Sequence, residues 1–226
     1  MNRFCFHIAI FLLAFSISFG DLYAAPNEST FRIARVKYSG GGDWYNDPSS
    51  EVNLISYLNR NTNIFILYPE YEFVSLESDN IFSYPILFLT GHGNLSFTEK
   101  EISNLRAYLE NGGFLYIDDD YGIDKFIRKE MKKVFPDQEF RELPFSHGIY
   151  SCHFNFPNGL PKIHEHDAKA PQGFGLFANG RLCVFYTYET NLADGWCDQS
   201  VHNNTEEVRE KALKMGVNII VWALDN

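Results

Sequence analysis

The sequence has few basic residues and no cluster of them. Lysine and arginine together number 19, against 29 aspartates and glutamates, so the formal net charge is -10. Proteins that bind nucleic acid concentrate lysine and arginine along the path of the phosphates. The composition therefore argues against nucleic acid as a partner.

Cysteine is also scarce. Apart from Cys5, the chain contains only Cys152, Cys183 and Cys197. Three cysteines cannot form a closed disulfide framework, so at most one bridge is expected and its pairing is open. The absence of Cys-x-x-Cys spacing argues against a zinc ribbon.

Long apolar runs are absent outside the N-terminal segment. Residues 4–20, FCFHIAIFLLAFSISFG, follow Arg3, and Ala24 offers a small residue for cleavage. This pattern predicts a signal peptide over 1–24 and export to the periplasm or beyond the cell. The alternative is an uncleaved anchor, for which the run is short. Residues 25–226 are the right length for a single domain, with no further membrane span.

Apolar periodicity in the first half predicts alternating strands and helices. Strands are expected at 31–38, 63–69, 85–90 and 114–118, and helices at 49–59, 98–110 and 124–135. Thr98 and Glu101 have the spacing of a helix capping box. Strand and helix in alternation predict an α/β fold with a mostly parallel sheet.

The second half is richer in loops. Residues 138–144 predict a strand, and Asn179-Gly180 between apolar runs predicts a β-hairpin. Residues 156–175 hold too many prolines and glycines for regular structure. A final helix is expected from about Thr205, with Gly216 as a point where it weakens or breaks.

Three of the predicted strands end in unusual residues. Ligands of open parallel sheets bind beyond the carboxyl ends of the strands, where neighbouring loops meet. We therefore predict a site at this edge, although a glycine-rich loop can also be a simple tight turn. The predicted ligand-binding residues are Gly41, Gly42, Asp43, Trp44, Gly91, Gly93, Asp118 and Tyr121, with Asp120, His92 and Asp119 as catalytic residues if the protein is an enzyme.

The run Asp118 to Asp120 is the strongest chemical feature of this edge. Adjacent carboxylates repel one another, and when buried they need a cation, a basic side chain or a shifted pKa. A divalent metal, His92, Arg35 or Lys37 could supply the positive charge. Oxygen ligands favour calcium, magnesium or manganese. The alternative is a solvated run in which one aspartate caps the next helix.

A second candidate metal cluster lies in the loop-rich half. On extended backbone, His164 and His166 of KIHEHD project to one face and could bind zinc, with Asp167 beside them. A plain surface loop is the alternative. The segment DGWCDQSVHNN adds Asp194 and His202 as a possible binding loop.

The order of motifs resembles a bacterial family of domains of unknown function, number 4159. The resemblance rests on RVKYSGGGDWYNDP, LTGHGN, LRAYLENGGFLYIDDDYG, FPNGLPKIHEHDAKAPQGFG and DGWCDQSVHNN, and spans about residues 31–224. That family is similar to the class I glutamine amidotransferase-like superfamily, which implies a flavodoxin-like three-layer sandwich.

One departure from that superfamily bears on activity. Its enzymes carry Gly-x-Cys-x-Gly at the strand-to-helix turn, where the cysteine is the nucleophile, and the matching stretch here is 118–122 with Asp120 in the cysteine position. A carboxylate cannot form the thioester of that chemistry, so glutaminase activity is not expected. The same resemblance places His92 opposite Asp120.

Two functions remain open. The first is a non-catalytic ligand- or cation-binding scaffold of the cell envelope, with a small molecule, a glycan, a peptide or an envelope protein as partner. The second is a hydrolase that uses Asp120 with His92, with or without a divalent metal. The sequence favours the first, because the superfamily nucleophile is lost.

Overall fold

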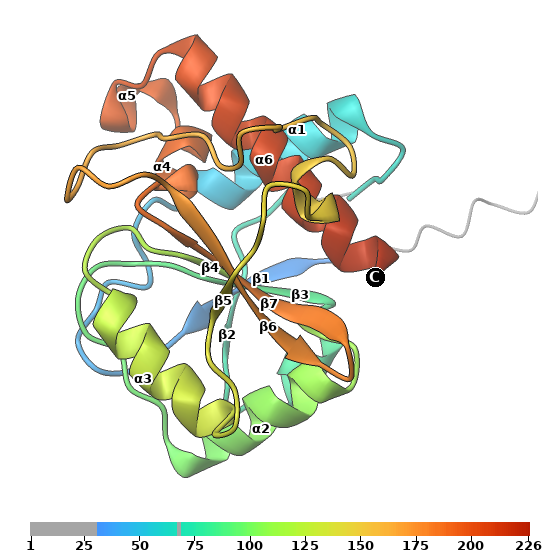
Figure 1. Cartoon of the computed structure of the whole chain (residues 1–226), viewed down its shortest axis with the longest axis vertical. Helices are drawn as coiled ribbons and strands as arrows, with labels where there is room; N and C mark the ends of the chain where they lie inside the picture. The colour runs from blue at the N-terminus through green and yellow to red at the C-terminus, as the bar shows by residue number, and fades with distance from the viewer. Residues whose placement is uncertain (1–30, 67–68) are drawn as a thin grey trace, which may run out of the picture.

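The computed structural model describes residues 31–66 and 69–226 (Figure 1). The expected signal peptide, 1–24, lies outside the described residues. Within the described residues, no helix is long and apolar enough to cross a membrane.

One seven-stranded sheet organises the described chain. Its strands are β1 (Ile33–Lys37), β2 (Phe73–Ser75), β3 (Ile86–Leu89), β4 (Phe114–Asp118), β5 (Arg141–Glu142), β6 (Gln172–Ala178) and β7 (Arg181–Tyr188). Their order in the sheet is β2-β1-β3-β4-β7-β6-β5. The first five in this order are parallel, and β6 and β5 add antiparallel pairs at one edge. The prediction of a mostly parallel α/β sheet is confirmed.

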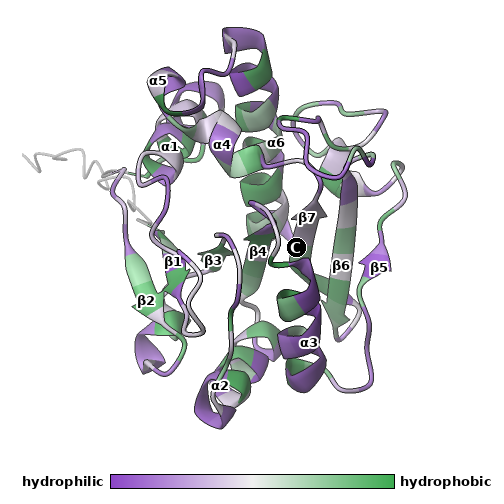
Figure 2. Cartoon of the chain, turned by 90° about the vertical axis from the view of Figure 1, so that its left-hand side faces the viewer, coloured by the Kyte–Doolittle hydropathy of each residue, from purple (hydrophilic) through white to green (hydrophobic). Residues whose placement is uncertain are grey.

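Helices lie on both faces of this sheet (Figures 1 and 2). They are α1 (Ser50–Asn61), α2 (Glu99–Glu110), α3 (Asp124–Val134), α4 (Leu192–Trp196), α5 (Gln199–His202) and α6 (Glu206–Asp225). In both views α2 and α3 lie against one face, and α1, α4 and α6 gather on the other. Each face of the sheet therefore has its own hydrophobic core.

Alternation along the strands explains why both cores form. In β3, Leu87 and Leu89 belong to the core on the α2 and α3 side, whereas Ile86 and Phe88 belong to the other. Successive side chains of a strand point to opposite faces. The uninterrupted apolar run at 85–90 is thus the sequence pattern of a strand covered on both sides.

Several local predictions are confirmed. Thr98 caps α2 and forms the full capping box with Glu101. Thr205 caps α6 through the backbone N–H of Val208. Asn179 and Gly180 both adopt positive φ, 53° and 82°, in the turn between β6 and β7, as a tight hairpin requires.

Four local predictions are wrong. The irregular stretch expected over 156–175 ends early, because β6 begins at Gln172. The strand predicted over 63–69 is absent from residues 63–66 and 69, and residues 67–68 lie outside the described residues. The Ile66 backbone N–H donates to the Asn59 side chain. The strand expected over 138–144 shrinks to the two residues of β5. Gly216 does not interrupt α6, where an added Cβ would lie 2.5 Å from Leu54 Cδ1, so the glycine permits close helix packing.

Candidate functional site

The three consecutive aspartates have three different environments. Asp118 is fully buried and accepts hydrogen bonds from Thr187 Oγ1 at 2.5 Å and from the Ala193 backbone N–H at 2.8 Å. Burial raises the pKa of its carboxyl to about 7. Because Ala193 lies in α4, this hydrogen bond connects that short helix to the end of β4.

Asp119 has a second structural role. It accepts the backbone N–H of Ile123 at 3.0 Å, just before α3 begins, and only 4% of it is exposed. Burial raises its pKa to about 6. The sequence predicts Asp118 as a ligand-binding residue and Asp119 as a catalytic residue. Both side chains instead point into the fold, where a ligand does not reach them.

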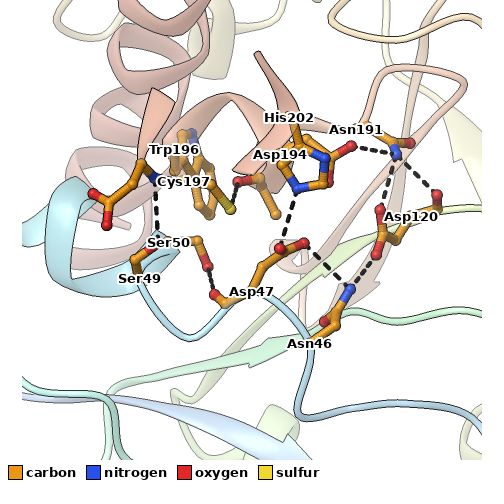
Figure 3. Close-up of polar contacts among 12 residues, drawn as sticks. Asn46, Asp47, Ser49, Ser50, Asp120, Asn191, Asp194, Trp196, Cys197 and His202 are labelled. Carbon is orange, nitrogen blue, oxygen red and sulfur yellow. Dashed lines mark hydrogen bonds and ion pairs between the residues drawn. The ribbon is translucent and has the colours of Figure 1, made fainter. Parts of the chain in front are cut away.

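Asp120 faces the polar cluster at the strand ends (Figure 3), and of the three aspartates only Asp120 lines the cleft there. The Asn191 side-chain amide donates to its Oδ1 at 2.9 Å, and the Asn46 amide donates to its Oδ2. Burial, followed by the negative charge of Asp194, raises its pKa to about 9. The surroundings of Asp120 therefore favour a proton or a cation on this carboxyl group.

Asp120 lies in the wall of an open cleft of about 590 Å³. The cleft is lined by His92, Asp120, Tyr121, His164, Glu165, His166, Asn191, Asp194 and His202. No lysine or arginine is among these described lining residues. The cleft thus combines carboxylates with histidines, which are the common ligands of divalent metals.

Asp194 is the centre of the cluster. His164 Nδ1 lies 2.5 Å from its Oδ2, and His202 Nε2 lies 3.5 Å from its Oδ1. Only 3% of the residue is exposed, and Oδ1 accepts no N–H or hydroxyl hydrogen bond from the described residues; its polar neighbours are His202 Nε2 and the Asp120 carboxyl. A buried carboxylate oxygen without a donor is rare, because desolvating it is unfavourable. This oxygen is available to a cation.

The two histidines differ in how they are held. His164 Nε2 lies 3.1 Å from Asn204 Oδ1, so the ring can direct Nδ1 toward Asp194. The hydrogen bond with Asp194 outweighs burial and raises the pKa of His164. His202 Nε2 lies between Asp194 and Asp47, 3.1 Å from Asp47 Oδ1. His164 Nδ1 and His202 Nε2 thus both point toward the Asp194 carboxylate.

Asp47 joins the cluster from the loop after β1. The buried Arg35 donates to the backbone carbonyls of Asn46 and Asp47, and the Ser50 hydroxyl donates to the latter at 2.8 Å. Asp47 itself has a positive φ of 47°. Arg35 therefore shapes the loop that presents Asp47 and does not neutralise the aspartate run.

Overlapping sets of potential metal ligands result. The ligand atoms of His164, Asp194 and His202 lie within 4.8 Å of one another, and so do those of Asp47, Asp120 and Asp194. A third set joins Asp47 and His202 to Cys197. Two imidazole nitrogens with a carboxylate form a ligand set suited to zinc or manganese.

A second pair of residues stands beside the cluster. His92 Nδ1 lies 3.0 Å from Asp43 Oδ2, and the His92 backbone N–H donates to Asp43 Oδ1 at 2.5 Å. The same Nδ1 lies 3.4 Å from Asp120 Oδ2. These contacts with His92 outweigh burial and lower the pKa of Asp43. Asp43 thus orients an imidazole that is 52% exposed at the cleft.

Two of the four predicted glycines allow loops to approach each other closely. An added Cβ at Gly42 would lie 2.6 Å from the His92 carbonyl, and one at Gly91 would lie 2.3 Å from the Tyr38 hydroxyl. Nothing lies near Gly41 or Gly93. None of these four glycines lines the cleft.

The predicted aromatic residues separate. Trp44 packs on Phe73 at the β2 edge, with ring centroids 5.3 Å apart, and is outside the cleft lining. Tyr121 lines the cleft, is 53% exposed and has a φ of 147°. Its ring contacts His166 at a centroid distance of 4.7 Å.

The predicted zinc trio of the KIHEHD segment is not brought together. His164 joins Asp194 and His202, whereas His166 lies against Tyr121. Asp167 is exposed and pairs with Lys169 at 3.5 Å. Among the described residues, neither His166 nor Asp167 belongs to a group with metal-binding spacing.

Sequence reasoning missed Asp47 and Asn191 and recognised Asp194 and His202 only as parts of a loop. Asn191 adopts a left-handed conformation with φ 55° immediately before α4. An asparagine is tolerated in that conformation. The segment TNLADGW contains no other sequence signal that predicts a turn. The carboxamide reaches Asp120 because the start of α4 is hydrogen-bonded to the end of β4, through the Ala193 N–H and Asp118.

Comparison with known proteins identifies a family but no activity. A family model described as a domain of unknown function (DUF4159) matches residues 32–224. No curated protein matches the chain. The matched range contains every residue of the cluster.

Proposed function

We propose that this chain, which belongs to the DUF4159 family, is an exported domain that binds a divalent cation in its acidic cleft and presents that cation to a ligand. The observation that carries the proposal is Asp194, buried between two histidines with one oxygen lacking a donor among the described residues. A cation bound by His164, His202 and Asp194 would supply the missing interaction.

The environment of the cluster supports a cation over an anion. The described residues that line the cleft include no lysine or arginine. Three carboxylates lie close to one another, those of Asp47, Asp120 and Asp194. Their mutual repulsion is relieved by protonation, as the raised pKa of Asp120 indicates, or by a metal ion. The open cleft leaves room for a further ligand on the ion.

Export and the finer fold relationship belong to this proposal. The apolar N-terminal run supports export. The order β2-β1-β3-β4-β7 supports a flavodoxin-like sandwich related to the glutamine amidotransferase-like superfamily. Asp120 replaces the expected nucleophile, and the thiol of Cys197 is buried with its pKa raised by that burial. Both features argue against glutaminase chemistry.

Elemental analysis of untagged protein, expressed from the full sequence and purified without chelator, tests the proposal. We expect a bound divalent metal in the native protein and in His166→Ala, and its loss in His164→Ala. The His166 variant removes a neighbouring imidazole outside the cluster, so it controls for nonspecific binding. Metal content below stoichiometry in every sample, unchanged after incubation with zinc or manganese, would refute the proposal.

A hydrolase is a second candidate function, favoured by one contact. His92 is oriented by Asp43 and lies 3.4 Å from Asp120 at the cleft. A histidine held by a carboxylate can accept a proton from a water molecule activated nearby. The test is turnover of ester, amide, phosphate and glycoside panels by the metal-loaded protein. Activity abolished by His92→Gln but retained in His153→Gln, at a remote exposed histidine, would support it; equal activity in both would exclude it.

A further inference from the structure

The two principal ligand sets share one residue. Asp194 belongs both to the set with His164 and His202 and to the set with Asp47 and Asp120. We propose that the cleft holds a pair of divalent cations, with Asp194 as the carboxylate that bridges them. This inference rests on the proposed function and specifies the composition of its metal centre.

The two oxygens of Asp194 are suited to separate ions. Oδ2 lies 2.5 Å from His164 Nδ1 and accepts from Asn191 Nδ2 at 3.1 Å. Oδ1 lies beside His202 and lacks a hydrogen-bond donor among the described residues. The ion held by the two histidines would use Oδ1, the oxygen without a donor. Oδ2 shares the Asn191 amide with Asp120, so it remains for the ion of Asp47 and Asp120.

Neutral amides hold the three carboxylates in place without balancing their charge. Asn46 Nδ2 donates to Asp120 and lies 3.5 Å from Asp47 Oδ2, while Asn191 Nδ2 donates to both Asp120 and Asp194. An amide can orient a carboxylate but supplies no positive charge. Such fixed carboxylates form a preorganised oxygen site, the type that manganese and magnesium occupy.

The charge balance indicates what the pair of ions would bind. Three carboxylates carry three negative charges, and a pair of divalent cations carries four positive charges. One positive charge therefore remains at the mouth of the cleft, where a hydroxide or an anionic oxygen of a ligand can bridge the ions. Carboxylate and phosphate groups are ligands of this chemical class.

Manganese titration of the full chain, after removal of metal by chelator, tests the stoichiometry. We expect a pair of Mn²⁺ ions per chain by native mass spectrometry and calorimetry, with an electron paramagnetic resonance spectrum broadened by coupling between bridged ions. Asp120→Asn and Asp47→Asn should each bind a single ion with an uncoupled spectrum. Glu165→Gln, in the cleft lining but outside both sets, should still bind the pair.

The outcomes separate this inference from the proposed function. A single Mn²⁺ per native chain, unaffected by Asp120→Asn or Asp47→Asn but lost in His164→Ala, would overturn the bridged pair and leave the cation-binding proposal intact. Absence of Mn²⁺ binding to a folded native chain would overturn both. Circular dichroism of each variant establishes that it is folded, and the use of two carboxylate variants guards against a defect in one of them.

Discussion

Two groups of buried charges lie side by side in this protein and differ in balance. Arg35 and Glu51 form a closed pair, with Glu51 accepting from Arg35 Nε at 2.7 Å and from Nη2 at 2.6 Å. The neighbouring cluster of Asp47, Asp120 and Asp194 is paired only with histidines, and no lysine or arginine is among the described residues that line its cleft. Burial of charge is common to both, so burial alone does not identify a site. The aspartate cluster, which lacks a lysine or arginine partner among the described cleft residues, is therefore the candidate site for a bound metal ion.

The first way to test this contrast is to break the balanced pair. Arg35→Met leaves Glu51 buried without its partner and releases the loop carbonyls that Arg35 binds, so we expect a loss of about 3–5 kcal/mol in the free energy of unfolding. Chemical denaturation at neutral pH measures it. Lys211→Ala, in an exposed pair with Glu207, should leave the denaturation midpoint unchanged. A midpoint for Arg35→Met equal to that of the native chain would contradict the assigned structural role.

The second test removes charge from the unbalanced cluster. Asp194→Asn should weaken binding of zinc or manganese by at least about 100-fold, equivalent to about 2.7 kcal/mol, because it removes the central ligand. The metal-free variant should lose far less stability than Arg35→Met, since the substitution removes a buried negative charge and leaves no unpaired carboxylate at that position. Calorimetric metal titration and denaturation in chelator measure the two effects. Native affinity in Asp194→Asn would remove Asp194 from the site.

The third test uses pH to separate a structural aspartate from the cluster. The pKa of Asp118 is raised in the folded state to about 7, so its contribution to stability is complete below the unfolded pKa of about 4 and is lost as pH rises toward 7. We expect the metal-free protein to lose on the order of 2 kcal/mol from this group between pH 5 and pH 8. The pKa values of Asp119 and Asp120 are also raised, so these groups likewise lower the stability as pH rises.

Asp118→Asn imitates the protonated form and can still accept from Ala193 while facing the Thr187 hydroxyl. Its unfolding free energy in chelator should therefore fall less steeply with pH than that of the native chain. Denaturation curves at several pH values provide the comparison. Parallel curves for variant and native chain would show that Asp118 does not titrate as its burial implies.

The smallest expected effect concerns the backbone next to Asp120. Tyr121 holds a φ of 147°, which a glycine adopts without strain, so Tyr121→Gly should stabilise the fold by about 1 kcal/mol. Tyr45→Gly makes the same change at an exposed tyrosine outside the positive-φ residues and should not stabilise. If thermal unfolding shows both variants equally destabilised, the strain at Tyr121 is not significant.

Much of the architecture is predictable from the sequence because the patterns that determine it are local. The apolar run of β3, the capping box at Thr98 and the Asn179-Gly180 turn each predict their structure from a few adjacent residues. The carboxyl-end rule for parallel sheets likewise directed attention to His92 and Asp120, which the structure places 3.4 Å apart.

The composition of the cluster could not be read in the same way. The run Asp118 to Asp120 looks uniform in sequence, yet the docking of α4 and the start of α3 engage its first two members and leave only the third in the cleft. His164 pairs with a carboxylate 30 residues later in the chain, not with its close neighbour His166. Such pairings depend on tertiary docking, which periodicity does not reveal.

The most direct test of the central claim is anomalous scattering from a crystal of the protein loaded with manganese or zinc. We expect a peak within coordinating distance of His164 Nδ1, His202 Nε2 and the Asp194 carboxylate. A fully loaded crystal with no anomalous peak in the cleft, or with metal only at surface residues elsewhere, would contradict the account.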